Sequence, residues 1–197
     1  CGTLDASAQN GDSPVKNWAG SGPDDFPNST AIGFANVMAL QERRHACLWC
    51  PIACKGLMKA GEKYSYPAGV HKPEYETLAS FGTMLLNDDL ESIIQANNLC
   101  NRYGVDTISA GATLACHAEI TGRRLSPGEI LALLEDIASG RMPALARGSR
   151  RYAAAEGMPG ASMSVKSLEL PAYDPRGAYG MALAYAVSIL GGCHLRA

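Results

Sequence analysis

The segment "SPGEILALLEDIASG", residues 126–140, contains every local signal of a helix. Ser126 is a typical N-cap, Pro127 suits the first helical position, and Glu129 completes a capping-box pattern. Gly140 is of the residue type that commonly ends a helix. This segment predicts an amphipathic helix with one face in a core. The apolar face consists of Ile130, Leu133, Leu134 and Ile137.

Similar signals occur along the rest of the chain. Residues 87–104 begin with acidic residues and end at a glycine, and residues 106–122 and 181–192 also show helical patterns. No alternating strand pattern of useful length follows residue 75. The sequence therefore predicts a mainly α fold.

The N-terminal third is less regular. Residues 27–44 predict a helix that leads into a cysteine loop, with Asn28 or Ser29 as its N-cap. Residues 55–72 are interrupted by glycine and proline and predict a loop or a small hairpin.

We expect three parts in the chain. Residues 1–30 are rich in Gly, Asp, Asn, Ser and Pro and predict an irregular lead-in. Residues 31–160 form the predicted helical domain, which contains the cysteine loop. Residues 161–197 are expected to begin a second helical domain.

The composition excludes some partners. Of the 197 residues, 47% are hydrophobic and 18% are charged, and the formal net charge of -2 offers no basic surface for nucleic acid or an anionic membrane. No apolar run is long enough to span a bilayer, and no secretory signal is visible. We expect a cytoplasmic protein that binds a small molecule or another protein.

Three closely spaced cysteines are the main chemical motif. Cys47, Cys50 and Cys54 lie within "CLWCPIACK", residues 47–55, where disulfides would close only tiny loops and leave one thiol over. Thiolates at this spacing are typical of zinc and iron–sulfur sites. The absence of a second cysteine pair favours an iron–sulfur cluster with a fourth ligand elsewhere. A third interpretation is that these cysteines are buried and bind no metal.

The sequence also resembles a known family. Five blocks in order carry the likeness: "CLWCPIACK", "KPEYETLASFG", "NNLCNRYGVDTISAG", "LELPAYDPRG" and "GMALAYAVSILGGCHLRA". Together they resemble the tungsten-containing aldehyde:ferredoxin oxidoreductases, over the second domain and the start of the third. The resemblance implies the helical fold of that domain.

The resemblance implies a [4Fe-4S] cluster with Cys47, Cys50 and Cys54 as three of its ligands. It also implies a tungsten or molybdenum bis-pterin, both cofactors being incomplete in this chain, with the fourth cluster ligand beyond Ala197. The implied substrate is a small aldehyde and the implied electron acceptor is ferredoxin. A homodimer is left open for the full-length protein.

The resemblance gives roles to individual side chains as well. Asp106 would accept a hydrogen bond from the pterin, although it also suits an ordinary N-cap. Glu74 or Glu76, together with His194, would move the proton as an aldehyde becomes a carboxylate. Arg176, in the predicted turn "YDPRG", is a candidate for binding a phosphate or carboxylate in the complete protein.

Two other function classes remain open from the residues alone. One is a zinc-stabilised helical binding module, and the other is a structural helical domain with idle thiols. Because the chain begins at Cys1 and lacks the β domain that the resemblance implies, we expect a fragment that has no activity alone.

Overall fold

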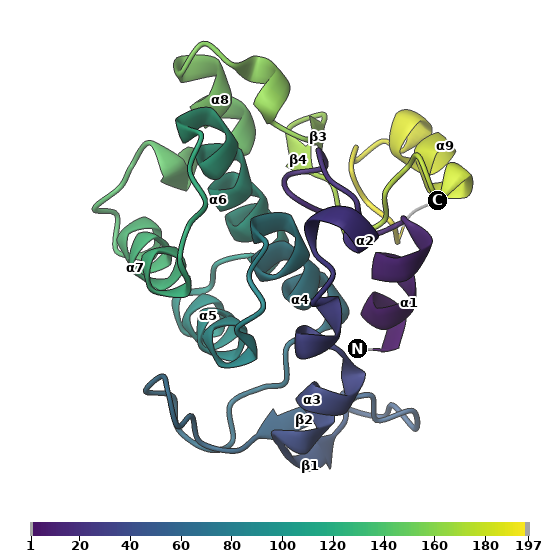
Figure 1. Ribbon diagram of the computed structural model, residues 1–197, viewed down its shortest axis with the longest axis vertical. Coiled ribbons are helices and arrows are strands. Elements are labelled where there is room, and N and C mark those ends of the chain that lie inside the picture. The colour runs from purple at the N-terminus through teal and green to yellow at the C-terminus, as the bar shows by residue number, and fades with distance from the viewer. Residues whose placement is uncertain (1, 196–197) are drawn as a thin grey trace.

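A computed structural model describes residues 2–195 and shows a mainly helical protein (Figure 1), which confirms the predicted fold class. Cys1 and the last two residues of the "GGCHLRA" motif lie outside the described residues. The α-helices are α1 (Gly2–Asn10), α2 (Gly22–Asp25), α3 (Phe34–Ala39), α4 (Tyr75–Phe81), α5 (Leu90–Tyr103), α6 (Thr107–Thr121), α7 (Pro127–Ala138), α8 (Ser149–Ala155) and α9 (Tyr179–Val187). Short 3-10 turns are η1 (Ser29–Ile32), η2 (Thr83–Leu85), η3 (Leu145–Arg147) and η4 (Pro159–Ala161). The strands are β1 (Gln41–His45), β2 (Lys55–Met58), β3 (Ser164–Val165) and β4 (Leu168–Glu169).

The helices with clear sequence signals begin and end as predicted. In α7, the Ser126 hydroxyl accepts from the N–H of Glu129, and the Glu129 carboxylate accepts from the N–H of Ser126 at 2.8 Å. Helix α5 ends at Gly104, which adopts the left-handed conformation with φ of 69°. Local capping chemistry therefore sets these boundaries.

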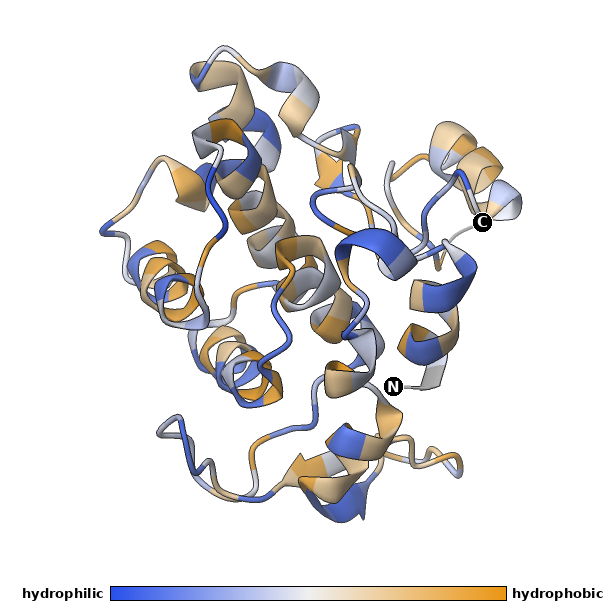
Figure 2. Cartoon of the chain, in the orientation of Figure 1, coloured by the Kyte–Doolittle hydropathy of each residue, from blue (hydrophilic) through white to orange (hydrophobic). Residues whose placement is uncertain are grey.

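Helix α6 is the centre of the packing. It contacts α4, α7 and α8, and its middle, including Leu114, Ala115 and Cys116, is buried. Apolar colours run around this helix in Figure 2, as expected for a helix enclosed by others. Helices α5 and α7 pack together beside it.

Helices α4 and α6 approach each other closely at Gly111. A Cβ placed on Gly111 would lie 2.5 Å from the Ser80 Cβ and 2.7 Å from the Ser80 carbonyl carbon. Any larger side chain would therefore push the two backbones apart. This contact fixes the position of α4, whose first turn carries Glu76.

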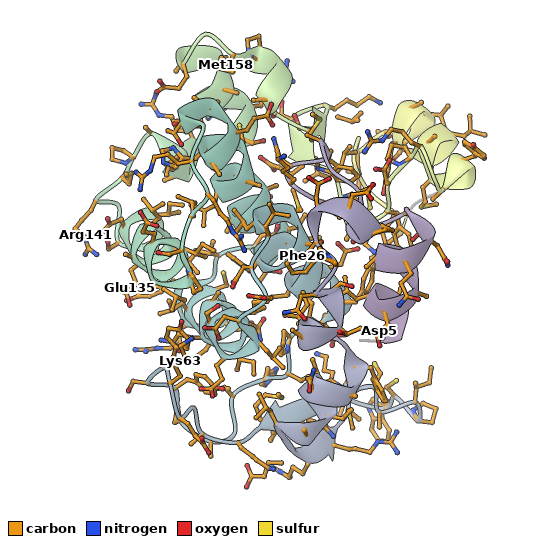
Figure 3. The ribbon with its side chains drawn as sticks, viewed as in Figure 1. Asp5, Phe26, Lys63, Glu135, Arg141 and Met158 are labelled. Atoms are coloured by element: carbon orange, nitrogen blue, oxygen red, sulfur yellow. The ribbon has the colours of Figure 1, made fainter. Side chains whose placement is uncertain are left out.

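The predicted helix over residues 27–44 is wrong in its extent. Gly33 is extended and separates η1 from α3, and the chain from Gln41 onward is a strand. Asp5, labelled in Figure 3, accepts from the N–H of Phe34 at 3.1 Å and so satisfies the start of α3. Asn28 does precede η1, but its side chain donates a hydrogen bond to Asp88 and does not cap η1.

Residues 1–30, expected to be irregular, contain α1 and α2. Leu4 and Ala8 of α1 are buried, and Val15 further along also joins the core. Tertiary burial overrides the weak helical signal of this Gly- and Asn-containing segment. The same core extends to Ala172, so it includes residues of all three expected parts, whose boundaries stay a prediction.

The loop or small hairpin predicted over residues 55–72 is confirmed, because the chain turns back after β2 and forms an antiparallel bridge between Leu57 and His71. Strand β2 pairs antiparallel with β1, the strand that was expected to be helical. Leu57 and Met58 are buried, whereas most of β1 is exposed. The cysteine loop, residues 46–54, joins the two strands and lies at the end of the molecule away from α8 (Figure 1).

The C-terminal segment returns to the N-terminal part of the chain. After the short β3–β4 hairpin, the N–H of Asp174 donates to the Asp12 carbonyl at 2.7 Å. Helix α9 ends at Val187, earlier than the sequence predicts, and Leu183 and Val187 are exposed. No helix within residues 2–195 is both long and apolar enough to cross a bilayer.

A buried carboxylate connects the second hairpin to two helices. Glu169 is 5% exposed and accepts from the hydroxyls of Ser109 and Ser149, each at 2.9 Å, and from the N–H of Ser149 at 2.9 Å. These bonds attach β4 to the starts of α6 and α8. They also compensate the burial of the carboxylate.

The close approach at Gly111 predicts a specific sensitivity. Gly111→Ala should destabilise the chain by about 1–3 kcal/mol, because the added methyl group overlaps the Ser80 backbone. Gly128→Ala is the matched control, since nothing lies within 4 Å of a Cβ on Gly128. The control should be neutral or stabilise the chain by up to about 1 kcal/mol. Urea unfolding measures both changes, and equal effects would contradict the packing argument.

Candidate functional site

Two of the predicted acid–base residues meet in the structure. Glu76 lies in the first turn of α4, and His194 lies near the C-terminal end of the described chain. The His194 Nε2 atom is 3.4 Å from the Glu76 Oε1 atom, and the side chains are only 19% and 12% exposed. The fold therefore brings together a carboxylate and an imidazole that are far apart in the sequence.

The second oxygen of Glu76 is held by the backbone. Its Oε2 atom accepts from the N–H of Ala172 at 2.7 Å. Ala172 and His194 both belong to the C-terminal segment, so this segment contacts both oxygens of the carboxylate. The hydrogen bond to Oε2 orients the carboxylate, so that Oε1 lies on the side of His194.

Tyrosine rings lie beside this pair. The ring centres of Tyr75 and Tyr173 are 5.5 Å apart, and those of Tyr173 and His194 are 5.7 Å apart. The Tyr185 hydroxyl donates to the Tyr173 carbonyl at 3.2 Å. The sequence prediction did not include these tyrosines. Tyr75 and Tyr185 lie in the blocks that contain Glu76 and His194, and Tyr173 lies in the "LELPAYDPRG" block.

Burial changes the chemistry of Glu76. It raises the pKa of Glu76 above its ordinary value, and the Tyr75 side chain, the Ala172 N–H and His194 offset only part of that rise. The Tyr75 hydroxyl and the Glu76 Oε1 atom are both buried without a hydrogen-bond partner among residues 2–195. The site can thus hold a proton and still offer polar atoms to a polar ligand.

Glu74 lies in different surroundings. It occupies the N-cap position of α4 without a side-chain cap bond and is exposed. It lines a cavity of about 120 Å³ together with His71 and two lysines, Lys55 and Lys72. The structure therefore separates the two glutamates of the "PEYET" motif, and only Glu76 contacts His194.

Asp106 is the N-cap of α6, as its sequence position allows. Its Oδ2 atom accepts from the N–H of Ser109 at 2.7 Å, and the side chain is exposed. Within the described part of the chain, its Oδ1 atom has no hydrogen-bond partner in the structure. One oxygen of Asp106 is therefore able to accept a further hydrogen bond.

Arg176 already binds a carboxylate of its own chain. Its Nε donates to Asp174 at 2.9 Å, and its Nη2 donates to the Trp18 carbonyl at 2.7 Å. These bonds attach the "YDPRG" turn to the N-terminal part. The Arg176 side chain is 66% exposed, so it also faces solvent.

The three motif cysteines lie on one exposed loop. Cys47 and Cys54 are exposed, Cys50 is half-buried, and the N–H of Cys50 donates to the Cys47 carbonyl at 3.0 Å. Trp49 and Ala53 adopt left-handed backbone conformations, with φ of 62° and 49°. The loop consequently turns sharply twice between its cysteines.

Basic residues hold the ends of this loop. Arg44 donates to the Ile52 carbonyl at 3.1 Å, and Lys72 donates to the Cys54 carbonyl at 2.6 Å. Leu48, Trp49 and Ile52 are exposed by 86%, 92% and 71%. Apolar side chains so exposed are typical of a surface that another part of a protein covers.

The remaining cysteines of the described chain differ from this triplet. Cys100 and Cys116 are buried, and burial raises the pKa of each to about 12. They therefore pack as small apolar residues. Cys193, next to His194, is half-buried.

The donor set of the loop suits an iron–sulfur cluster, because such clusters are held by thiolates and this loop carries three thiols on one short segment. Among residues 2–195, no three His, Cys, Asp or Glu side chains are gathered as they would be around a metal. Binding would therefore require the loop to close around the cluster.

Sequence comparison identifies the family. The sequence profile described as "Aldehyde ferredoxin oxidoreductase, domains 2 & 3" matches residues 1–197, the whole chain. The chain belongs to the aldehyde ferredoxin oxidoreductase family. The resemblance found in the sequence is thereby confirmed.

Relatives with the name tungsten-containing aldehyde ferredoxin oxidoreductase are similar to this family member. The protein of Pyrococcus furiosus is 39% identical over 209 residues, which cover 95% of this chain and 33% of the relative. The protein of Thermococcus kodakarensis is 42% identical over 173 residues, 78% of this chain and 28% of the relative. The chain thus spans about a third of the length of these relatives.

The raised pKa of Glu76 predicts a pH-dependent stability. In the unfolded chain this carboxyl titrates near its ordinary value of 4.5, whereas the folded chain holds the proton to higher pH. The stabilisation that the folded chain gains by binding this proton is fully present below pH 4.5, and it is lost as the pH rises through the pKa of the folded chain. Relative to Glu76→Gln, the wild type should therefore lose stability as the pH rises. Urea unfolding between pH 4 and 8 measures this difference.

Glu129 provides a control of opposite sign. Backbone and side-chain hydrogen bonds from Ser126 lower the pKa of Glu129, so its contribution is lost as the pH falls. Relative to Glu129→Gln, the wild type should gain stability as the pH rises. If the stability of the wild type relative to each Gln variant changed in the same direction with pH for Glu76 and for Glu129, the assigned environment of Glu76 would be contradicted.

Proposed function

We propose that the full-length protein that contains this chain oxidises aldehydes to carboxylic acids and transfers the electrons to ferredoxin. Family membership supports the reaction class, and the contact between Glu76 and His194 is the observation that carries it to this chain. The reaction converts an aldehyde and water to a carboxylic acid, two protons and two electrons. Residues that move protons are therefore required.

Glu76 is the proposed proton acceptor, and His194 is its partner. Proton transfer is most efficient when the pKa of the group lies near the working pH, and burial raises the pKa of Glu76 toward that range. The Ala172 N–H holds Oε2 and leaves Oε1 on the side of His194. Protons can therefore move at Oε1, between the carboxylate and the imidazole.

The tyrosine shell limits access of water to this site. Tyr75 and Tyr173 contact each other, and Tyr173 also contacts His194. Because the Glu76 and His194 side chains are largely removed from water, the electrostatic interaction between them is stronger than in water. Glu74, which is exposed and lies outside this shell, is not assigned a role in proton transfer.

Cys47, Cys50 and Cys54 are proposed to hold a [4Fe-4S] cluster, with the fourth ligand outside this chain. Asp106 is proposed to accept from a pterin through its remaining oxygen. Arg176 is proposed to bind an anionic group of the same cofactor through its exposed side. When bound, the tungsten or molybdenum pterin would take up the two electrons, and the cluster would pass them on singly.

The roles of the two glutamates can be separated by mutation. In the full-length enzyme, Glu76→Gln and His194→Asn should each lower kcat for aldehyde-dependent viologen reduction by about 100-fold or more, because proton transfer is lost. Glu74→Gln, in the same motif, should change kcat less than about threefold. Iron content is measured in parallel to exclude loss of the cofactor. A normal kcat for Glu76→Gln would refute the assignment.

The cysteine loop is tested through iron content. Cys50→Ser in anaerobically purified full-length protein should lose cluster iron and the brown absorbance, because a ligand is missing. Cys116→Ser is the control, since that thiol is buried in the core. Equal iron in wild type and Cys50→Ser would rule out the cluster. Colourless wild-type protein with one zinc would instead support a zinc-stabilised binding module.

A further inference from the structure

A cavity of about 300 Å³ lies apart from the Glu76–His194 pair. Its floor is apolar and is formed by Met84 and Leu85 at η2 and by Ala115 and Ala118 on α6. Met84, Leu85 and Ala115 are each less than 5% exposed. The volume is at the lower end of the range of small-molecule sites. At roughly 30 Å³ per heavy atom it would hold about ten such atoms.

The wall formed by residues 16–19 has an unusual backbone. Lys16, Asn17 and Trp18 are three successive non-glycine residues with positive φ, at 52°, 46° and 69°. Hydrogen bonds from the N–H groups of Lys16 and Asn17 to the carbonyls of Thr83 and Met84 hold this conformation. Such backbone conformations are unfavourable and cluster at ligand-binding sites.

The rim of the cavity carries charged side chains. Lys16, Arg123, Arg124 and Glu119 line the cavity. Glu119 accepts a hydrogen bond from the buried Asn17 side chain at 2.5 Å, and because this amide is uncharged, Glu119 keeps its negative charge. Because Lys16 and Arg123 pair with Asp25 and Glu129, the rim holds, in the part of the chain that the structure describes, one unpaired cation, Arg124, beside the carboxylate of Glu119.

Arg124 is the cation of this rim that lacks a charged partner. Lys16 pairs with Asp25, and Arg123 pairs with Glu129. Arg124 donates to the Leu86 carbonyl at 2.5 Å, and no carboxylate within residues 2–195 forms an ion pair with it. A guanidinium bound only to a carbonyl can still bind a carboxylate in bidentate geometry.

We propose that this cavity binds a medium-chain carboxylate, with the carboxylate at Arg124 and the alkyl chain on the floor of Met84, Leu85, Ala115 and Ala118. The site goes beyond the proposed function, and its occupation requires no metal or pterin. Its apolar walls disfavour a phosphate or a nucleotide, which would need several donors.

Calorimetric titration of the 197-residue chain with sodium octanoate tests the proposal. Octanoate has about the ten heavy atoms that the cavity holds and should bind saturably. The Arg124→Gln variant should bind it about tenfold or more weakly, because a charge-assisted bond is lost. Ala118→Leu, which fills the floor, should abolish binding. Arg151→Gln, an exposed arginine on α8, is the matched control and should bind like the wild type.

Two results would overturn the proposal. One is no saturable binding of octanoate below about 10 mM, and the other is equal affinity of wild type and Arg124→Gln. If Arg124→Gln fails to fold, 1-octanol with the wild type replaces it, since the alcohol should bind about tenfold more weakly than the carboxylate. These measurements use the chain without cofactors, so their failure leaves the proposed function untouched.

Discussion

The crossing of α4 and α6 at Gly111 is the contact on which the rest of the structure depends. With no side chain at this position, the backbone of Ser80 can lie directly on α6. One turn before Ser80, α4 presents Glu76, and the Ser80 hydroxyl donates to the Glu76 carbonyl at 2.7 Å. The separation of the two helices thus determines where the carboxylate lies relative to His194 and to the start of α6.

The parts of the fold that could be predicted are those with local causes. The Asp106 and Ser126 caps and the glycine after α5 act within a few residues of chain, so their patterns indicate helix ends directly. Helix α1 and strand β1 could not be predicted in this way. Leu4 is stabilised by burial against distant segments, and β1 is stabilised by pairing with β2, which no local pattern reports.

The residues of the candidate site also differ in whether a local sequence pattern can reveal them. The cysteine triplet is visible in sequence because its spacing is local. Glu76 and His194 were found through a family resemblance, and spacing alone could not show that they meet or that Glu74 lies apart. The backbone N–H of Ala172 and the ring of Tyr173 could not be predicted at all, because their roles depend on the return of the C-terminal segment across α4.

That return also has a consequence for the order of folding. Helices α4 to α8 pack mainly on one another within residues 75–155, so they can assemble before the C-terminal segment is in place. The segment that carries Ala172 and His194 must instead close a loop of roughly a hundred residues onto α4, which is entropically unfavourable and slow. Glu76 should therefore stay hydrated until late in folding. During synthesis on the ribosome, this carboxylate would become desolvated only after the C-terminal segment has been made.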